Sequence, residues 1–333
     1  MDLATALNHL EFYDKNYHVI RHGIKTKRIR NKDKEYIGNK NQRKCRFCGK
    51  KKEETTFRKV AHAIPELIGN KVLISFEECD QCNAIFSKLE NDLANYLALE
   101  RSTSGIKGKV GVPTYKNNKG LKIKHSKESD NRILVNDILN SGNVIEDDVD
   151  KSFTIKAERK PYTPIAVYKC FAKMALSIMP PDYLPYFKNT LDWIREENHS
   201  KYNQSNCIMF EQFISTSRPS DQIDVMVFLK KQESHEKIMF CVFFISIGYY
   251  CYQIYLPYAT PYSIDDEKNL TEVNLTYKLF PCKHVFLLPE SNITINQIDL
   301  SSSDQVKGQK IDITYTYDKK EVITDTEIMS KFN

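Results

Sequence analysis

The stretch that decides the fold runs from residue 45 to residue 83 and reads CRFCGKKKEETTFRKVAHAIPELIGNKVLISFEECDQCN. A Cys-x-x-Cys pair stands at each end, Cys45 with Cys48 and Cys79 with Cys82. Two such turns supply four thiolates to one ion, as a tetrahedral structural Zn²⁺ requires. Four cysteines close the site to substrate, so the pattern predicts that zinc stabilises the fold and takes no part in catalysis. Chance cysteines or a redox pair are the alternatives.

Between and after the two pairs the pattern predicts two short strands, a turn and a helix. The strands are expected over residues 55–62 and 73–78, with the loop IPELIGNKV between them. The helix is expected over residues 83–100 because apolar residues recur at a spacing of three or four. This stripe comprises Ile85, Leu89, Leu93, Tyr96 and Leu97.

This order of elements (CxxC, then His-x-Ile-Pro-Glu-x-x-Gly-Asn, then CxxCN and a helix) resembles the HNH endonucleases. These are the ββα-metal nucleases, and the four-cysteine subgroup is built on a zinc-stabilised treble clef. The resemblance covers about residues 44–97. It implies that His62 is the general base, that Asn83 binds the catalytic divalent ion (Mg²⁺ or Mn²⁺), and that Asn70 ties the two strands together through its side chain.

Each of these residues also has a purely structural interpretation. A histidine at the end of a strand is usually a satisfied structural residue, Asn83 could cap its helix, and Asn70 after Gly69 is a turn residue in any case. The surrounding motif favours the catalytic interpretation. A neutral imidazole suits a general base at pH 7 because its ordinary pKa is near 6.5.

One position departs from the pattern of the family. Many HNH enzymes have Asp, Glu or His before the catalytic histidine as a second metal ligand, and here that residue is Ala61. Nearby side chains that could replace it are Glu66, Glu78, Asp80, Ser87 and Glu90. Glu90 is the preferred candidate, although it stands two helical turns, about 11 Å of rise, from Asn83. Without such a ligand, the domain would be a non-catalytic, zinc-dependent DNA-binding module.

Positive charge concentrates in the part of the chain that holds the cysteine pairs. Residues 1–127 carry 27 Lys and Arg against 14 Asp and Glu, whereas residues 128–333 carry 22 against 29. Such a surface attracts phosphates, although a lysine-rich solvated face is the plainer interpretation. The residues expected to contact nucleic acid are Arg43, Lys44, Arg58, Lys59, Lys71 and Lys88.

The remainder of the chain predicts a second α+β unit. Two helices are expected over residues 165–179 and 183–196. Seven strands of a mainly antiparallel sheet should follow, at 207–215, 224–231, 237–246, 249–257, 284–289, 293–300 and 312–317. The apolar run from Ile238 to Leu256 is broken by Gly248 and therefore predicts two buried strands. The five other cysteines, in apolar surroundings, are expected to be buried thiols.

The predicted organisation is α+β throughout. A basic arm with a short helix (1–43) precedes the HNH domain (44–100), a linker with short strands (101–160), and a domain that senses a signal or binds a partner (161–333). By analogy with the HNH family, the protein is expected to be a bacterial anti-phage or restriction effector that cleaves DNA. A nucleotide signal, an Argonaute-like protein or self-assembly into a homo-oligomer would control it. The first residues contain no secretory signal, so the expected location is the cytoplasm.

Overall fold

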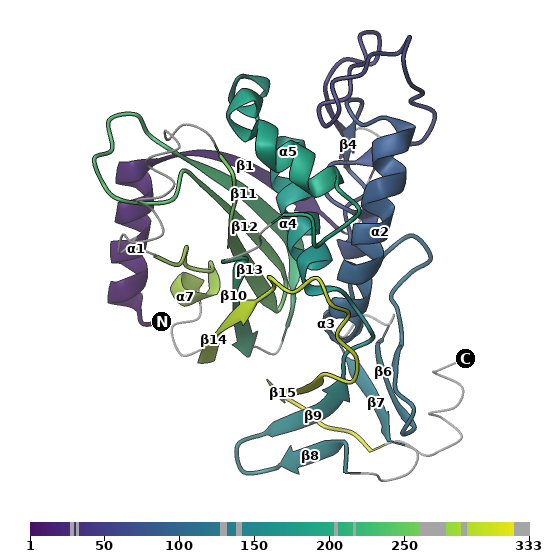
Figure 1. Cartoon of the computed structure of the whole chain (residues 1–333). Helices are drawn as coiled ribbons and strands as arrows, with labels where there is room; N and C mark the ends of the chain where they lie inside the picture. The colour runs from purple at the N-terminus through teal and green to yellow at the C-terminus, as the bar shows by residue number, and fades with distance from the viewer. Residues whose placement is uncertain are drawn as a thin grey trace.

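The computed structural model describes residues 1–26, 30, 33–126, 132–137, 142–202, 206–215, 218–259, 278–287 and 292–322. A six-stranded antiparallel sheet forms its centre (Figure 1). From one edge to the other the strands are β1 (Tyr17–Lys25), β11 (Ser220–Lys230), β12 (Cys241–Gly248), β13 (Tyr250–Tyr255), β10 (Ile208–Ser215) and β14 (Asn292–Asp299). The prediction of a mainly antiparallel sheet is therefore confirmed.

The run from Ile238 to Leu256 forms two strands, as predicted, and both are completely buried. The chain reverses between them at Gly248, whose φ is +60°. A side chain at this position would also collide with Ser104, because an added Cβ would lie 2.4 Å from the Ser104 Cβ. Glycine therefore serves both the turn and the close approach.

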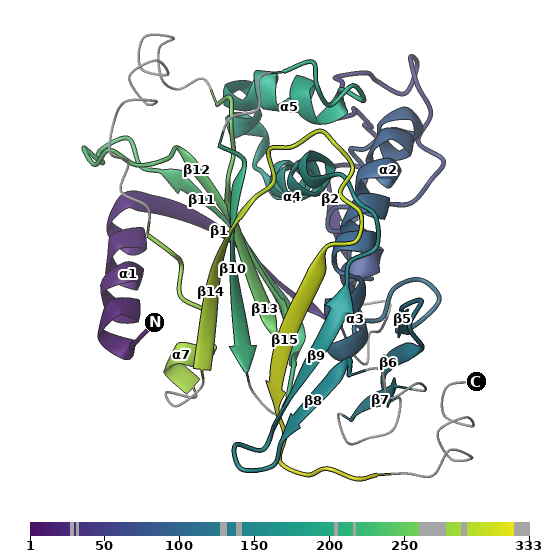
Figure 2. The same ribbon diagram turned by 60° about the horizontal axis from the view of Figure 1, so that its bottom comes forward.

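Helices cover both faces of this sheet (Figure 2). On one face lie α1 (Leu3–Asn16) and α7 (His284–Leu287), and Tyr13 of α1 packs against Phe228. The other face is covered by α4 (Pro164–Ile178), which is buried along its whole length. The 3-10 helix η3 (Pro181–Phe187) and α5 (Lys188–Arg195) follow it. No helix among the described residues is long and apolar enough to cross a membrane.

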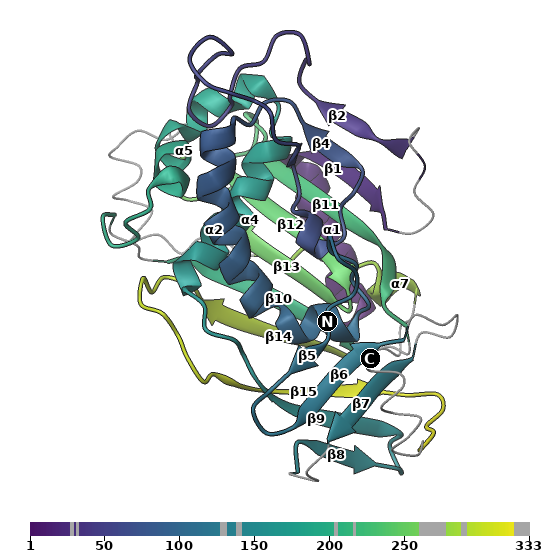
Figure 3. The same ribbon diagram turned by 90° about the vertical axis from the view of Figure 1, so that its right-hand side faces the viewer.

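The segment with the cysteine pairs packs on the outer side of α4. It contains β2 (Glu35–Ile37), β3 (Ala61–His62), η2 (Glu66–Ile68), β4 (Leu73–Ser75), α2 (Asp80–Tyr96) and α3 (Ala98–Thr103). Figure 3 shows α2 lying beside α4 in front of the large sheet. One hydrophobic cluster runs from Phe86 of α2 through Phe171 of α4 to Phe243 of the sheet. The cysteine-containing segment and the sheet thus share a core.

Besides the three-stranded sheet of β2, β4 and β3, two small sheets lie below the large one in the view of Figure 1. One contains β5 (Tyr115–Lys116), β6 (Leu121–His125) and β7 (Ile133–Asp137). In the other, β9 (Ser152–Glu158) pairs with both β8 (Val144–Asp147) and β15 (Lys310–Thr316). A strand from the end of the chain therefore pairs with the segment predicted to be a linker.

Several local predictions were wrong. Residues 17–25, placed in the basic arm with no strand predicted, form β1. The sequence contains little signal for this strand, because its partner β11 lies some 200 residues away and a half-exposed edge strand has weak alternation. Residues 284–287, predicted as a strand, form α7, since a short apolar run fits a buried turn as well as a strand. Only Ala61 and His62 of the strand predicted over 55–62 are extended in a sheet. The first part of the helix predicted at 183–196 is the 3-10 helix η3.

Candidate active site and metal centre

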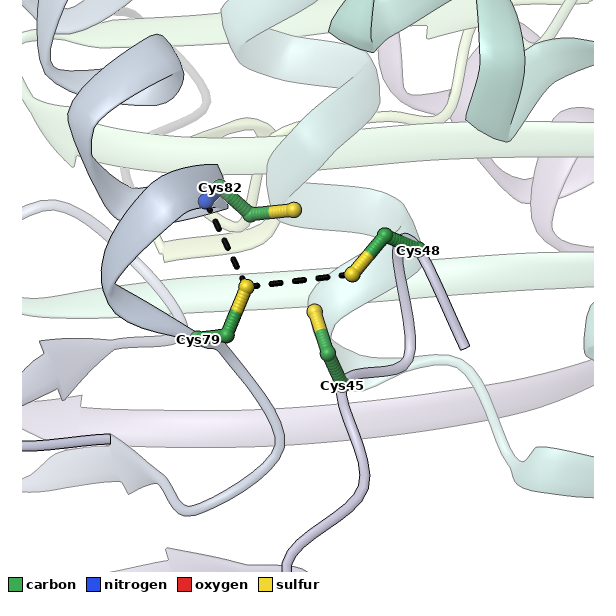
Figure 4. Close-up of side chains that lie close together, drawn as sticks. All are labelled: Cys45, Cys48, Cys79 and Cys82. Atoms are coloured by element: carbon green, nitrogen blue, oxygen red, sulfur yellow. Dashed lines mark hydrogen bonds between the residues drawn. The ribbon is translucent and has the colours of Figure 1, made fainter. Parts of the chain in front are cut away.

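Cys45, Cys48, Cys79 and Cys82 converge, as their spacing predicted. Figure 4 shows the four side chains pointing toward one another, and their sulfurs all lie within 4.8 Å of one another. The Sγ atoms of Cys48 and Cys79 are 3.7 Å apart. Tetrahedral zinc with Zn–S bonds of about 2.3 Å requires S···S separations of about 3.8 Å. The donor set therefore fits a structural metal such as zinc.

The local backbone explains how each pair is positioned. Gly49, with φ of +75°, turns the chain after the first pair, and its N–H donates to the Cys45 carbonyl at 2.8 Å. Cys79 is the N-cap of α2, and its Sγ accepts the Cys82 N–H at 3.5 Å. Arg46, which lies between Cys45 and Cys48, forms an ion pair with Glu77. It also donates hydrogen bonds to the Leu176 and Met179 carbonyls at the end of α4. The metal centre is thereby joined to α4.

Replacing Cys45 or Cys79 by serine should abolish metal binding and unfold the cysteine-containing segment. A structural zinc site contributes directly to folding, so its loss removes a large part of the stability of a small segment. Metal content per chain by mass spectrometry and thermal unfolding by circular dichroism measure both effects. The matched control is Cys207→Ala, which removes a buried thiol outside the cluster and should retain the metal. A folded, metal-free Cys45→Ser variant would disprove the structural role.

His62 faces a cavity of about 550 Å³. It ends β3, where it pairs with Ile74 of β4, and it is half-buried. Burial lowers the pKa of His62; Glu66 opposes this effect and Lys173 adds to it. The imidazole is therefore neutral at pH 7 and able to accept a proton.

Asn83, in the first turn of α2, lines the same cavity. Its side-chain nitrogen donates to Glu78 Oε1 at 2.9 Å. Because a carboxylate only accepts hydrogen bonds, the amide nitrogen must be the atom that faces Glu78. This bond fixes the orientation of the amide and turns its oxygen away from Glu78.

Glu78 is held in turn by Lys173 of α4. The Lys173 Nζ lies 3.1 Å from Glu78 Oε2, and both side chains are 1% exposed. Lys173 also donates to the His62 carbonyl oxygen at 3.0 Å. Burial alone would lower the pKa of Lys173, but the carboxylates of Glu78 and Glu90 raise it above its ordinary value. One charged lysine thus supports both His62 and Asn83.

Asn70 ties the loop to the strands through four side-chain hydrogen bonds. Its nitrogen donates to the Ile64 carbonyl at 2.6 Å and the Leu73 carbonyl at 2.9 Å, and its oxygen accepts the N–H groups of Val72 and Leu73. The side chain is completely buried and does not line the cavity. Asn70 is therefore a positioning residue that shapes the turn after His62.

Of the carboxylates considered as replacements at position 61, two line the cavity with His62 and Asn83: Glu66 and Glu90. Burial raises the pKa of Glu90. Ala61 points the opposite way from His62 and is 1% exposed, as expected for neighbours in a strand. Glu78 already forms an ion pair with Lys173 and accepts a hydrogen bond from Asn83, so it does not serve as the replacement ligand.

The two other candidates make local contacts. Asp80 accepts hydrogen bonds from the Thr56 hydroxyl at 2.6 Å and the Lys59 N–H at 2.9 Å. Burial alone would raise the pKa of Asp80, but these hydrogen bonds and those from Arg58 lower it to about 2. The Ser87 hydroxyl donates to the Ala84 carbonyl at 2.7 Å.

The six basic residues expected to contact nucleic acid separate into two groups. Three make contacts within the protein: Arg43 donates to the Phe57 carbonyl, Lys71 lies 3.9 Å from Glu66, and Lys88 lies 2.8 Å from Glu197. Lys44, Arg58 and Lys59 are exposed, although the Arg58 Nε lies 3.5 Å from Asp80.

Sequence reasoning missed Lys173, Arg101 and the loop of residues 108–113. Arg101 and this loop line the cavity, and Arg101 donates to the Leu67 carbonyl at 2.8 Å. For Lys173 a signal existed, since a lysine within an otherwise apolar helix that is buried all round requires an internal partner. The identity of that partner had no signal in the sequence.

Comparison with known proteins agrees with this geometry. The family model described as HNH endonuclease matches residues 45–97. No curated protein matches the chain, and no solved structure does. The matched residues contain both cysteine pairs, His62 and Asn83. Residues 45–97 are therefore an HNH endonuclease domain of the kind that carries four metal-binding cysteines.

Proposed function

We propose that the protein is a metal-dependent endonuclease that hydrolyses DNA phosphodiester bonds, with His62 as the general base. The observation that carries this proposal is the neutral, half-buried His62 facing one cavity together with Asn83 and two carboxylates. The cavity is large enough for a phosphate and its attacking water. The exposed side chains of Lys44, Arg58 and Lys59 favour a polyanionic substrate.

In the proposed reaction, the unprotonated nitrogen of His62 accepts a proton from water as the water oxygen attacks phosphorus. The bond from phosphorus to the leaving oxygen then breaks. Glu78 and Lys173 keep Asn83 and the His62 backbone in place, so the reacting groups are oriented before substrate arrives. Arg101 at the cavity wall contributes positive charge near the phosphate.

The Asn83 amide oxygen, Glu66 and Glu90 are the groups that would hold the catalytic divalent ion. A bound Mg²⁺ or Mn²⁺ supplies stabilisation of the negative charge on the phosphate and the leaving oxygen. Among the described residues, only the four cysteines form a preassembled group of three or more ligands. A site with only a few protein ligands suits Mg²⁺, because this ion keeps several of its waters and is also bound by the phosphates of the substrate.

The control of this activity is proposed to lie in the sheet and its helices. Lys173 belongs to α4, and α4 contacts β11, β12 and β13. A movement of α4 on the sheet would therefore be transmitted to His62 and Asn83 through the Lys173 side chain. We propose, by analogy with the HNH family, a cytoplasmic effector such as an anti-phage or restriction nuclease, whose cleavage depends on a signal or partner.

Cleavage of supercoiled plasmid with Mg²⁺ or Mn²⁺ tests the activity. We expect nicked and linear products that disappear when a chelator removes the divalent ion. Binding of the plasmid without cleavage, under either ion and with zinc retained, would instead identify a non-catalytic DNA-binding protein.

The pH profile of cleavage should have an acidic limb with its midpoint below 6.5. The base acts in its neutral form, and burial lowers the pKa of His62, so the active form persists to lower pH than for a free histidine. Measuring kcat/KM between pH 5 and pH 8 tests this expectation. A midpoint well above 6.5 would contradict the assignment of a buried neutral base.

A further inference from the structure

A second cleft, of about 1090 Å³, lies away from the HNH cavity. The β10 and β14 edge of the large sheet lines one side, and β9 and β15 line another. Tyr96 at the end of α2 and Glu100 of α3 also line it. The cleft thus lies where the large sheet, the small sheet and the end of the HNH helix meet.

Two buried carboxylates line this cleft, and each has one oxygen that lacks a hydrogen-bond partner among the described residues. Glu100 is 2% exposed and Glu211 is 6% exposed. Glu100 Oε1 accepts Arg159 Nη1 at 2.6 Å, and Glu211 Oε1 accepts the Asn296 nitrogen at 3.2 Å. The Oε2 atom of each glutamate is unpaired in the described part of the chain, as is the Tyr96 hydroxyl. Buried polar atoms without partners are rare and costly, so a ligand that hydrogen-bonds to these atoms would gain binding energy here.

The charge of the lining selects the kind of ligand. Four carboxylates line the cleft (Glu100, Glu211, Asp150 and Asp312), against one cation, Arg159. Arg159 is already engaged by Glu100 and by the Tyr96 carbonyl. Burial raises the pKa of Glu211, although Arg159 acts in the opposite direction, so this carboxylate is short of stabilising partners. A phosphate would be repelled here, and a donor-rich cation would be attracted.

We propose that this cleft binds a small organic cation, with an ammonium or guanidinium group that donates hydrogen bonds to Glu100 and Glu211. A metal ion fits less well, because the residues described in the structure contain no cluster of carboxylates that come together as the four cysteines do. The nucleotide signal expected by analogy also fits less well, since its phosphates are anionic. The hydroxyl and amide groups that line the rest of the cleft would bind the uncharged part of the ligand.

The cleft connects to the HNH cavity through two consecutive residues of α3. Glu100 lines the cleft, and Arg101 lines the cavity and donates to the Leu67 carbonyl. Arg159 also bonds to the end of α2, the helix that carries Asn83 and Glu90. A cation bound at Glu100 would compete with Arg159 and shift α3. This regulatory part rests on the proposed nuclease function, whereas the binding part does not.

Calorimetry and thermal unfolding of the full-length protein with agmatine, spermidine and AMP test the binding. We expect at least one of the two cations to bind and raise the melting temperature, and AMP to do neither. Glu211→Gln should weaken binding of that cation at least ~10-fold, since hydrogen bonds to charged groups contribute ~1.5–3 kcal/mol. Asp312→Asn, at an exposed position of the lining, should weaken binding by about threefold, because charges there are screened. It provides the measurement if Glu211→Gln does not fold.

The matched control is Asp318→Asn, which removes an exposed carboxylate that does not line the cleft and should bind normally. Absence of binding by both cations would overturn the proposal, as would binding that is equally strong in Glu211→Gln. Binding of AMP in their place would overturn it too.

Plasmid cleavage with and without the bound cation tests the regulatory part separately. The cation should change the cleavage rate of the wild-type protein and leave that of Glu211→Gln unchanged. A cation that binds without altering cleavage would refute the coupling alone. Protein that binds the cation yet never cleaves would refute the nuclease function alone.

Discussion

Replacing His62 by alanine should lower the rate of plasmid cleavage by ~10²- to 10⁴-fold, the usual contribution of a general base. The variant should fold normally, because the His62 side chain is only half-buried and its backbone carbonyl, the atom that Lys173 contacts, is retained. Cleavage time courses with Mg²⁺ and Mn²⁺ measure the loss. Thermal unfolding and metal content should match those of the wild-type protein.

The matched control is His18→Ala, which removes an exposed histidine of β1 outside the HNH cavity. Its cleavage rate should be unchanged. Metal-dependent cleavage that persists at the wild-type rate in His62→Ala would mean that another group acts as the base. It would leave the family assignment of residues 45–97 intact.

Replacing Lys173 by methionine should destabilise the protein by ~3–5 kcal/mol and abolish cleavage. Methionine has nearly the same length but no charge, so Glu78 would be left buried without its counterion. The His62 carbonyl would lose the hydrogen bond from Lys173, and the Glu78 carboxylate that orients Asn83 would lose its counterion. Urea unfolding measures the first effect, and plasmid cleavage below the unfolding transition measures the second.

A double-mutant cycle with Glu78→Gln separates the ion pair from packing. The pair Glu78→Gln and Lys173→Met removes both charges, so it should recover most of the stability lost in Lys173→Met alone. Cleavage should stay low, because the neutral amide introduced by Glu78→Gln would not orient Asn83 as the carboxylate does.

Lys169→Met provides the control within the same helix. Lys169 is also buried in α4, but its Nζ donates to the Glu196 carbonyl at 2.8 Å, away from the HNH cavity. Burial lowers the pKa of Lys169 to about 8. This variant should retain cleavage. Equal loss of cleavage in both lysine variants would show that α4 acts only through general stability.

The sequence by itself determined the parts of this protein that depend on short-range spacing. Two Cys-x-x-Cys turns can close on one ion wherever the intervening chain goes, so the metal centre was predictable from Cys45 to Cys82. The turn at Gly69 and Asn70 follows from local propensities as well. The helix, expected from Asn83, begins at Asp80 with Cys79 as its N-cap, so Asn83 lies inside the helix and does not cap it. Alternation and apolar runs were sufficient for five strands of the large sheet, β10 to β14.

Only the tertiary structure decided which distant groups complete the site. Lys173 lies 95 residues from Glu78, and no spacing rule relates a lysine in an apolar helix to a glutamate beside a cysteine. The selection of Glu66 and Glu90 depends on which side chains line the cavity. The pairing of β1 with β11 and of β15 with β9 joins segments that lie more than 150 residues apart in the sequence, as Tyr17 with Lys230 and Lys310 with Glu158 show. Long-range pairing is fixed by the packing of whole faces, and no local pattern records which faces will meet.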